Sequence, residues 1–232
     1  MEKPDYGTWV PLRYIYISGF LGVFFLLITF IYSPVIVVSI IFFIITAYFA
    51  YARNMFSQEG GDIQSRIHEL VLNHLNWNGN GEIIDIGCGN APLTIKAAKR
   101  YPNAFVTGID YWGGMWEYSI NMCMENAKIE GVADRINFQK ATASDLPFND
   151  GYFDAAISNL VFHEVNDTKD KRDVIKEALR VVKKGGVFSF QDLFHEKRIY
   201  GDMEDLLETI RSWGIERVEF SSTKDSEFIP VH

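Results

Sequence analysis

Several features that would point quickly to a function are scarce in this sequence of 232 residues. There are only two cysteines, Cys88 and Cys123, which are too few for a disulfide framework and favour a reduced, cytosol-like environment. The net charge of -8 argues against non-specific binding to nucleic acid, which needs a basic surface. The five histidines stand at spacings that form no metal-ligand cluster, so we expect no metal site.

Charged residues are also absent from Tyr14 to Ala52, a run roughly twice the ~20 residues that one transmembrane helix needs. Pro34 stands near its middle, and proline disfavours helix at the preceding residue and removes a backbone hydrogen bond. We therefore expect an N-terminal transmembrane hairpin that binds the lipid bilayer, with spans at about 13–31 and 35–52. Tyrosine and tryptophan gather toward its flanks, where an interfacial belt would place them.

The charges on either side predict how this hairpin is oriented. Lys3 and Arg13 precede the first span, Arg53 and Arg66 follow the second, and the turn carries no charge. By the positive-inside rule, both termini and the following domain face the cytoplasm at the cell membrane. Three alternatives stay open: a helix pair lying in one leaflet, a buried helix pair of a soluble protein, and a signal peptide, which the length of the run disfavours.

The sequence predicts three parts. Residues 1–53 form the expected hairpin, residues 54–81 form a connector with a first amphipathic helix, and residues 82–232 form a separate domain. Gly60-Gly61 in the connector are interpreted as a plain linker or as the hinge of a lid.

Strand and helix patterns alternate from Glu82 onward, which predicts a parallel sheet with helices on both faces. The expected strands are 82–86, 104–109, 136–140, 153–158, 186–192 and 215–221, with a last short strand at 228–231. The expected helices are 92–100, 115–130, 171–182 and 203–213.

The most informative stretch links the first strand to the first helix of this domain. A short apolar run ends around Asp85, Gly87-Cys88-Gly89 makes a tight turn, and a helix begins at Pro92. The next apolar run ends in Asp110, at the spacing of an acid that binds a ribose. Together these elements predict a site for an adenosine-bearing cofactor.

Five blocks in this order closely resemble the class I S-adenosylmethionine-dependent methyltransferases, especially the branch that includes quinone C-methyltransferases. The blocks are 82–91, 106–110, 143–148, 152–159 and 178–186, and the similarity covers about 62–221. The resemblance implies a Rossmann-like, doubly wound, mostly parallel sheet, S-adenosylmethionine as cofactor, and methyl transfer to a small acceptor. The hairpin is not part of the usual family core, and it favours a lipophilic or membrane-associated acceptor.

Other classes fit the sequence less well. The fingerprint of a nicotinamide-dependent dehydrogenase needs a glycine where Pro92 stands, and no G-x-x-x-x-G-K-[ST] sequence of a P-loop hydrolase occurs. A second function stays open: a catalytically inactive S-adenosylmethionine-binding protein that serves a membrane complex as a sensor or assembly factor.

The resemblance also implies roles for particular residues around the cofactor. Gly87 and Gly89 let the backbone approach the methionine part, and Cys88 offers backbone groups only. Asp85 braces the loop or holds the cofactor's ammonium through water. The carboxylate of Asp110 accepts from the ribose hydroxyls. Tyr111, followed by Trp112, packs against adenine or belongs to the core.

One position departs from the family pattern. Thr142 stands where the family commonly has an acid that meets the adenine amino group, so adenine recognition would rest on the threonine oxygen and the backbone of Ala143. Asn159, just past the fourth strand, is expected beside the sulfonium. His163 is the expected general base, with Glu164 as its rival; a pair without catalytic duty is the alternative.

Overall fold

The structure is a computed structural model of the chain, and it describes residues 3–113, 118–223 and 226. The chain forms two compact units. Gly7–Arg66 make up the first unit, which we call the hairpin unit. The described residues of Met1–Tyr6 and Ile67–His232 make up the second, which we call the catalytic unit because the sequence predicts the cofactor site there. The chain therefore enters the hairpin unit from the catalytic unit and returns to it.

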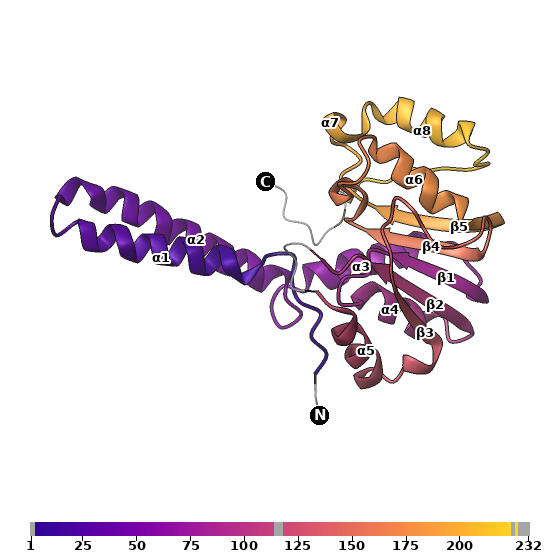
Figure 1. Cartoon of the computed structure of the whole chain (residues 1–232), viewed down its shortest axis with the longest axis horizontal. Coiled ribbons are helices and arrows are strands. Elements are labelled where there is room, and N and C mark those ends of the chain that lie inside the picture. The colour runs from indigo at the N-terminus through magenta and orange to yellow at the C-terminus, as the bar shows by residue number, and fades with distance from the viewer. Residues whose placement is uncertain (1–2, 114–117, 224–225, 227–232) are drawn as a thin grey trace. The chain divides into compact units, whose positions relative to one another are not determined.

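A five-stranded parallel sheet is the centre of the catalytic unit (Figure 1). Its order is β3-β2-β1-β4-β5, so the chain changes direction across the sheet between β1 and β4. In sheets of this kind, ligands bind beyond the carboxyl ends of the strands at that switch point. The strands are β1 (Gly81–Ile86), β2 (Ala104–Asp110), β3 (Ile136–Lys140), β4 (Phe153–Asn159) and β5 (Val182–Gln191).

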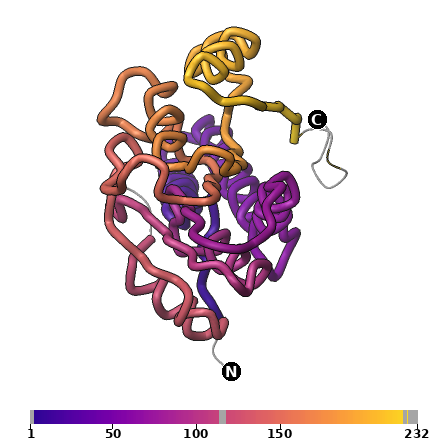
Figure 2. Tube along the Cα trace, turned by 90° about the vertical axis from the view of Figure 1, so that its right-hand side faces the viewer, coloured from indigo at the N-terminus to yellow at the C-terminus, as the bar shows by residue number. Residues whose placement is uncertain are grey.

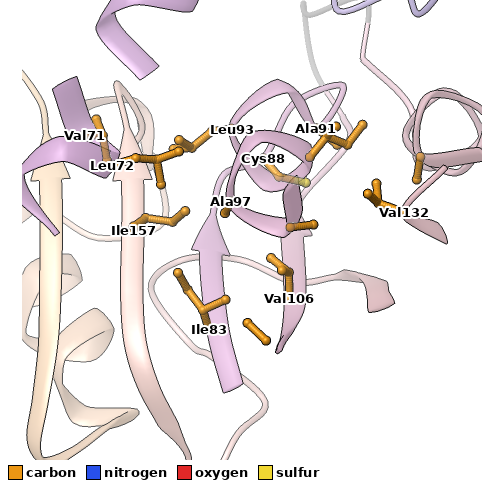
Figure 3. Packing of buried hydrophobic residues seen from close by; sticks show 14 of the residues in the cluster. Val71, Leu72, Ile83, Cys88, Ala91, Leu93, Ala97, Val106, Val132 and Ile157 are labelled. Atoms are coloured by element: carbon orange, nitrogen blue, oxygen red, sulfur yellow. The ribbon is translucent and has the colours of Figure 1, made fainter. Parts of the chain in front are cut away.

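Helices cover both faces of the sheet, because alternate residues of each strand point to opposite sides. On β1, Ile83 belongs to one buried cluster, and Ile84 and Ile86 belong to the other. The first cluster lies under α4 and α5 and includes Val71 and Leu72 of α3 (Figure 3). The second lies under α6, α7 and α8. The helices are α3 (Ile63–His74), α4 (Pro92–Arg100), α5 (Ile120–Ile129), α6 (Lys171–Arg180), α7 (Lys197–Tyr200) and α8 (Met203–Ser212).

Residues 3–6 are also part of this unit. They run along α5, as two views at right angles show (Figures 1 and 2). Tyr6 belongs to the first buried cluster.

The predicted Rossmann-like parallel sheet is confirmed, but some elements differ. The predicted strand at 215–221 is wrong: no strand occurs there, although Ile215 and Val218 pack against the second cluster. Their apolar pattern reflects a loop packed on the core. The predicted helix at 115–130 becomes α5, which begins after Ser119, whose side chain caps Met122 N–H at 3.2 Å. The beginning of that prediction and the strand at 228–231 lie outside the described residues.

In the hairpin unit, two helices are joined by a short turn that contains Pro34. They are α1 (Leu12–Ile28) and α2 (Ile36–Phe56), and the turn includes the 3-10 helix Ser33–Val35. Ser33–Phe56 is the one described segment long and apolar enough to cross a membrane, since Leu12–Ile28 is apolar but shorter. The two-span transmembrane hairpin therefore stays a prediction.

The polarity of the hairpin unit is inverted relative to a water-soluble helix pair. The buried residues of α1 and α2 are small, namely Ser18, Gly22 and Ser39, and the Ser39 hydroxyl donates to the Gly22 carbonyl at 2.8 Å. Large apolar side chains instead point outward: Phe20 is 69% exposed and Ile44 is 63% exposed.

Candidate active site

The loop between β1 and α4, residues 87–91, lies at the carboxyl end of the central strand, and we call it the cofactor loop. Gly87 has φ 75°, and a Cβ there would lie 2.2 Å from Val161, so only glycine fits. Gly89 has φ 57°, in the left-handed region that glycine adopts readily. Ala91 also adopts a left-handed conformation, with φ 67°.

The end of β2 holds this loop in place. The backbone N–H groups of Gly87 and Cys88 donate to the Ile109 carbonyl at 2.8 and 2.9 Å. The carboxylate of Asp110 accepts from Gly89 N–H at 2.9 Å and from Trp112 N–H at 2.8 Å, one bond to each oxygen. An ionised carboxylate has about four acceptor positions. Asp110 can therefore brace the loop and still accept from two ligand hydroxyls.

Asp85 lies beneath the loop and is 1% exposed. It accepts a hydrogen bond from the Thr94 hydroxyl of α4 at 2.6 Å. Burial raises the pKa of Asp85 to about 7; the Thr94 hydrogen bond opposes this and the charge of Asp110 adds to it. Burial also raises the pKa of Asp110, although its backbone donors pull the other way.

Within the described part of the chain, neither Asp85 nor Asp110 forms an ion pair. Two partly or fully buried carboxylates without a cation are stabilised in their charged form by a positively charged ligand. This arrangement fits S-adenosylmethionine, whose sulfonium and ammonium groups are cationic, better than an uncharged nucleoside.

The two residues that follow Asp110 have different surroundings: Trp112 supports the cofactor loop, and Tyr111 lies at the surface. Trp112 Nε1 donates to the Gly89 carbonyl at 2.9 Å, so this side chain supports the loop. Tyr111 is 64% exposed, with Lys140 Nζ 4.9 Å from its ring centroid, and its ring is open to a ligand. The side chain of Cys88 is buried in the first cluster, which leaves only its backbone for a ligand (Figure 3).

The side chain of Thr142 contacts the carboxylate of Asp167, which lies on a loop distant in the sequence. The Thr142 hydroxyl donates to Asp167 Oδ2 at 2.7 Å, and the Ser144 hydroxyl donates to the same oxygen at 2.7 Å. These two donors hold the pKa of Asp167 below its ordinary value. Ala143 between them is buried in the second cluster, so only its backbone can face a ligand. Asp167 was missed from the sequence because it lies on another loop.

Two buried amide oxygens at the carboxyl ends of the strands have no hydrogen-bond partner among the described residues. They are Asn159 Oδ1 at the end of β4 and Gln191 Oε1 at the end of β5, and the two residues pair in register. Unpartnered buried acceptors are rare in folded proteins. An incoming hydrogen-bond donor, such as a ligand ammonium or hydroxyl, would satisfy them. With the cofactor loop and Asp110, they fit the expected cofactor.

His163 pairs with an acid that the sequence analysis did not single out. His163 Nδ1 lies 2.6 Å from Asp192 Oδ1, and the Asp192 side chain is fully buried. Asp192 also accepts from the backbone N–H groups of Val161, Phe162 and Leu193, which fix its orientation. Burial lowers the pKa of His163, but the bond to Asp192 outweighs it, so the net pKa is raised. Asp192 directly follows β5, at the strand end where such a residue could have been sought.

The sheet and its carboxyl-edge loops define a Rossmann-like protein whose site suits a cationic nucleoside. A family model described as methyltransferase domain matches residues 78–225, and the chain belongs to this family. The predicted methyltransferase class and S-adenosylmethionine cofactor are thereby confirmed.

Curated proteins with similar sequences carry related names. The ubiquinone/menaquinone biosynthesis C-methyltransferase of Geotalea daltonii is 32% identical over 118 residues, which cover 50% of this chain and 47% of that protein. The malonyl-(acyl-carrier protein) O-methyltransferase of Geobacter sulfurreducens is 29% identical over 185 residues, which cover 75% of this chain and 65% of that protein. The chain thus matches about half to two thirds of these relatives.

Among solved structures, the (4+2)-cyclase SpnF superposes with a TM-score of 0.51 and 25% identity, covering 64% of this chain and 56% of that one. Its name shows that this fold also supports other chemistry, so the acceptor must be argued from the site and not from the fold.

Proposed function

We propose that this protein transfers a methyl group from S-adenosylmethionine to a small, lipophilic acceptor at the cytoplasmic face of a membrane. This proposal rests on Asp110, whose carboxylate accepts from Gly89 N–H and keeps free acceptor positions at the carboxyl end of β2, next to the switch point. When bound, the cofactor supplies a methyl group already activated by the positive charge on sulfur.

The chain's own residues would bind and orient that cofactor. Asp110 would accept from the ribose hydroxyls, and the Asn159 oxygen would accept from the methionine ammonium. The Tyr111 ring and the Thr142–Asp167 pair would meet the adenine. Asp167 places a carboxylate beside Thr142, where this chain lacks the usual family acid. Asp85 would act through charge and loop position, because it is buried against Thr94.

His163 would take a proton from the acceptor where the acceptor must lose one. In the neutral ring, the proton on Nδ1 is donated to Asp192, which leaves the lone pair of Nε2 available. A general base of this kind contributes about 10²- to 10⁴-fold in rate. Asp192 is a positioning residue, because it sets the tautomer and orientation of His163 without facing the acceptor itself.

The hairpin unit supports a membrane-associated acceptor. Small residues lie between its helices and large apolar ones face outward, as lipid favours and water does not. Arg13 stands at the start of the first expected span, and Arg53 and Arg66 follow the second span, a charge pattern that by the positive-inside rule favours a cytoplasmic position for both ends of the hairpin. One relative is also named for the biosynthesis of quinones, which are lipophilic.

Labelling of single cysteines tests the membrane topology. Cys88 and Cys123 are buried, so a cysteine introduced at the turn, Ser33→Cys, would be the reactive thiol. In intact cells, a membrane-impermeant maleimide should label Ser33→Cys but not the matched Ser57→Cys beyond α2. Equal labelling of both, or release of the chain by alkaline carbonate, would contradict the spanning hairpin.

The activity test uses membranes that contain the full-length chain and a donor labelled in its methyl group. We expect label in the lipid extract, and markedly less label with Asp110→Ala at a donor concentration that does not saturate the wild type. Donor binding without methyl transfer to any extracted molecule would instead favour the second function, an inactive S-adenosylmethionine-binding sensor or assembly protein. An absence of donor binding would refute both.

A further inference from the structure

The residues just ahead of the hairpin unit are bound to the catalytic unit through one buried amide. We call residues 3–6 the N-terminal strap. Asn126 Oδ1 of α5 accepts from Asp5 N–H at 2.8 Å, and Asn126 Nδ2 donates to the Asp5 carbonyl at 2.8 Å. The Asn126 side chain thus pairs with both backbone groups of residue 5, as an adjacent strand would.

The same amide also holds the cofactor loop. Asn126 Nδ2 donates to the Asn90 carbonyl at 3.0 Å, and Asn90 Nδ2 donates to the Asp5 carbonyl at 3.3 Å. Asn126 is 0% exposed and Asn90 is 2% exposed. Asn90 directly follows Gly89, whose carbonyl accepts from Cys123 Sγ at 3.0 Å. A continuous set of hydrogen bonds therefore runs from the strap through two buried amides to the loop that Asp110 braces.

Tyr6 anchors the strap on the helices beside this network. It is 9% exposed within the first cluster, and its hydroxyl donates to Glu130 Oε1 at 3.0 Å. Glu130 also forms an ion pair with Lys99 of α4. The strap thus contacts α5 directly and α4 through Glu130.

We propose that the strap is a positioning element of the cofactor site, with Asp5 and Asn126 as its positioning residues. This rests on the proposed function. If the strap leaves, the buried amides of Asn126 and Asn90 lose partners, and regaining partners requires the cofactor loop or α5 to move. Binding of the donor would then have to restore the loop geometry, which weakens its affinity.

A matched pair of substitutions isolates the backbone contact. Asp5→Pro removes the N–H that Asn126 accepts, whereas Asp5→Ala removes the same side chain and keeps the N–H. In the full-length protein in detergent, we expect calorimetry to give a dissociation constant for S-adenosylmethionine about tenfold higher for Asp5→Pro than for Asp5→Ala. The donor KM should rise similarly, with kcat at saturating donor unchanged, since the reacting groups stay in place.

Hydrogen exchange gives a readout that does not need the cofactor. Without ligand, the amides of Gly89 and Ser119 should exchange faster in Asp5→Pro than in Asp5→Ala. If Asp5→Pro did not fold, as judged by thermal melting, the comparison would use Tyr6→Phe against the wild type, with the same direction expected. Equal donor affinity and equal exchange in the compared pair would overturn the positioning role while leaving the proposed function intact. Failure of the wild type to bind donor would refute the proposed function. In that case, faster amide exchange in Asp5→Pro than in Asp5→Ala would show only that the strap orders the loop.

Discussion

His163 Nδ1 lies 2.6 Å from a fully buried oxygen of Asp192, and the two residues come from adjacent strand ends of the parallel sheet. His163 follows β4 and Asp192 follows β5, so the sheet itself brings them together. The pairing gives the histidine a fixed orientation and a raised pKa.

The pH profile tests this pairing. His163 must be neutral to accept a proton, and its raised pKa places the acidic limb of the kcat profile above the ordinary histidine value of ~6.5. Asp192→Asn removes the charge that raises the pKa, so the limb should move to lower pH while kcat on the plateau falls at least tenfold. Glu164→Gln is the control, because Glu164 Oε1 lies 3.8 Å from Nε2 and should shift the limb less. An unchanged limb in Asp192→Asn would argue against His163 as the base.

Removal of the Asp110 carboxylate should weaken donor binding. We expect Asp110→Ala to raise the dissociation constant for S-adenosylmethionine at least tenfold, roughly 1.4 kcal/mol, from the loss of charge-assisted hydrogen bonds. Asp134→Ala, at an exposed acid in the 3-10 helix Ala133–Arg135, is the matched control. Calorimetry that finds equal affinity in Asp110→Ala and the wild type would rule out the ribose contact.

The buried Asp85 should make the protein without ligand less stable as the pH rises. Because its folded pKa of about 7 exceeds the ordinary pKa of 3.8, the native state keeps the proton while the unfolded state loses it between these values. The destabilisation therefore develops from about pH 4 and is complete above about pH 7, where it reaches up to about 4 kcal/mol.

Asp85→Asn removes this titration and keeps an oxygen for Thr94. We expect its melting temperature to match the wild type near pH 4 and to exceed it at pH 8, while donor affinity at pH 8 falls. A stability difference that stays constant with pH would contradict the assignment, and Asp134→Asn should show no such divergence.

The contact between Thr142 and Asp167 should act as one unit in donor binding. We expect Asp167→Ala and Thr142→Val each to weaken the binding of S-adenosylmethionine a few-fold, because each removes one side of a charge-assisted hydrogen bond. The double variant should lose less than the product of the two, since the contact is shared. Calorimetry on the four proteins measures this coupling, and fully independent effects would exclude a joint role at the adenine.

The sequence predicted most of the sheet because its buried strands are short apolar runs between turn residues. Ile83, Val106 and Ile157 lie in strands whose positions were correct to within one or two residues. The segment at 215–221 misled the prediction, because Ile215 and Val218 are apolar for packing on the core without pairing in the sheet.

The site was partly predictable for a different reason. Gly87, Gly89 and Asp110 stand in a local pattern with fixed spacing, so a single sequence reveals them. Asp167 and Asp192 meet Thr142 and His163 only after the chain folds, and no spacing rule links residues so far apart.

The return of the chain to the catalytic unit on both sides of the hairpin unit limits how the hairpin helices can be removed. Truncation just before Ile67 would remove the apolar helices α1 and α2 together with Asp5 and Tyr6. A better derivative would keep the first six residues and the whole of α3, and would replace only positions 7–62 by a flexible glycine–serine tether.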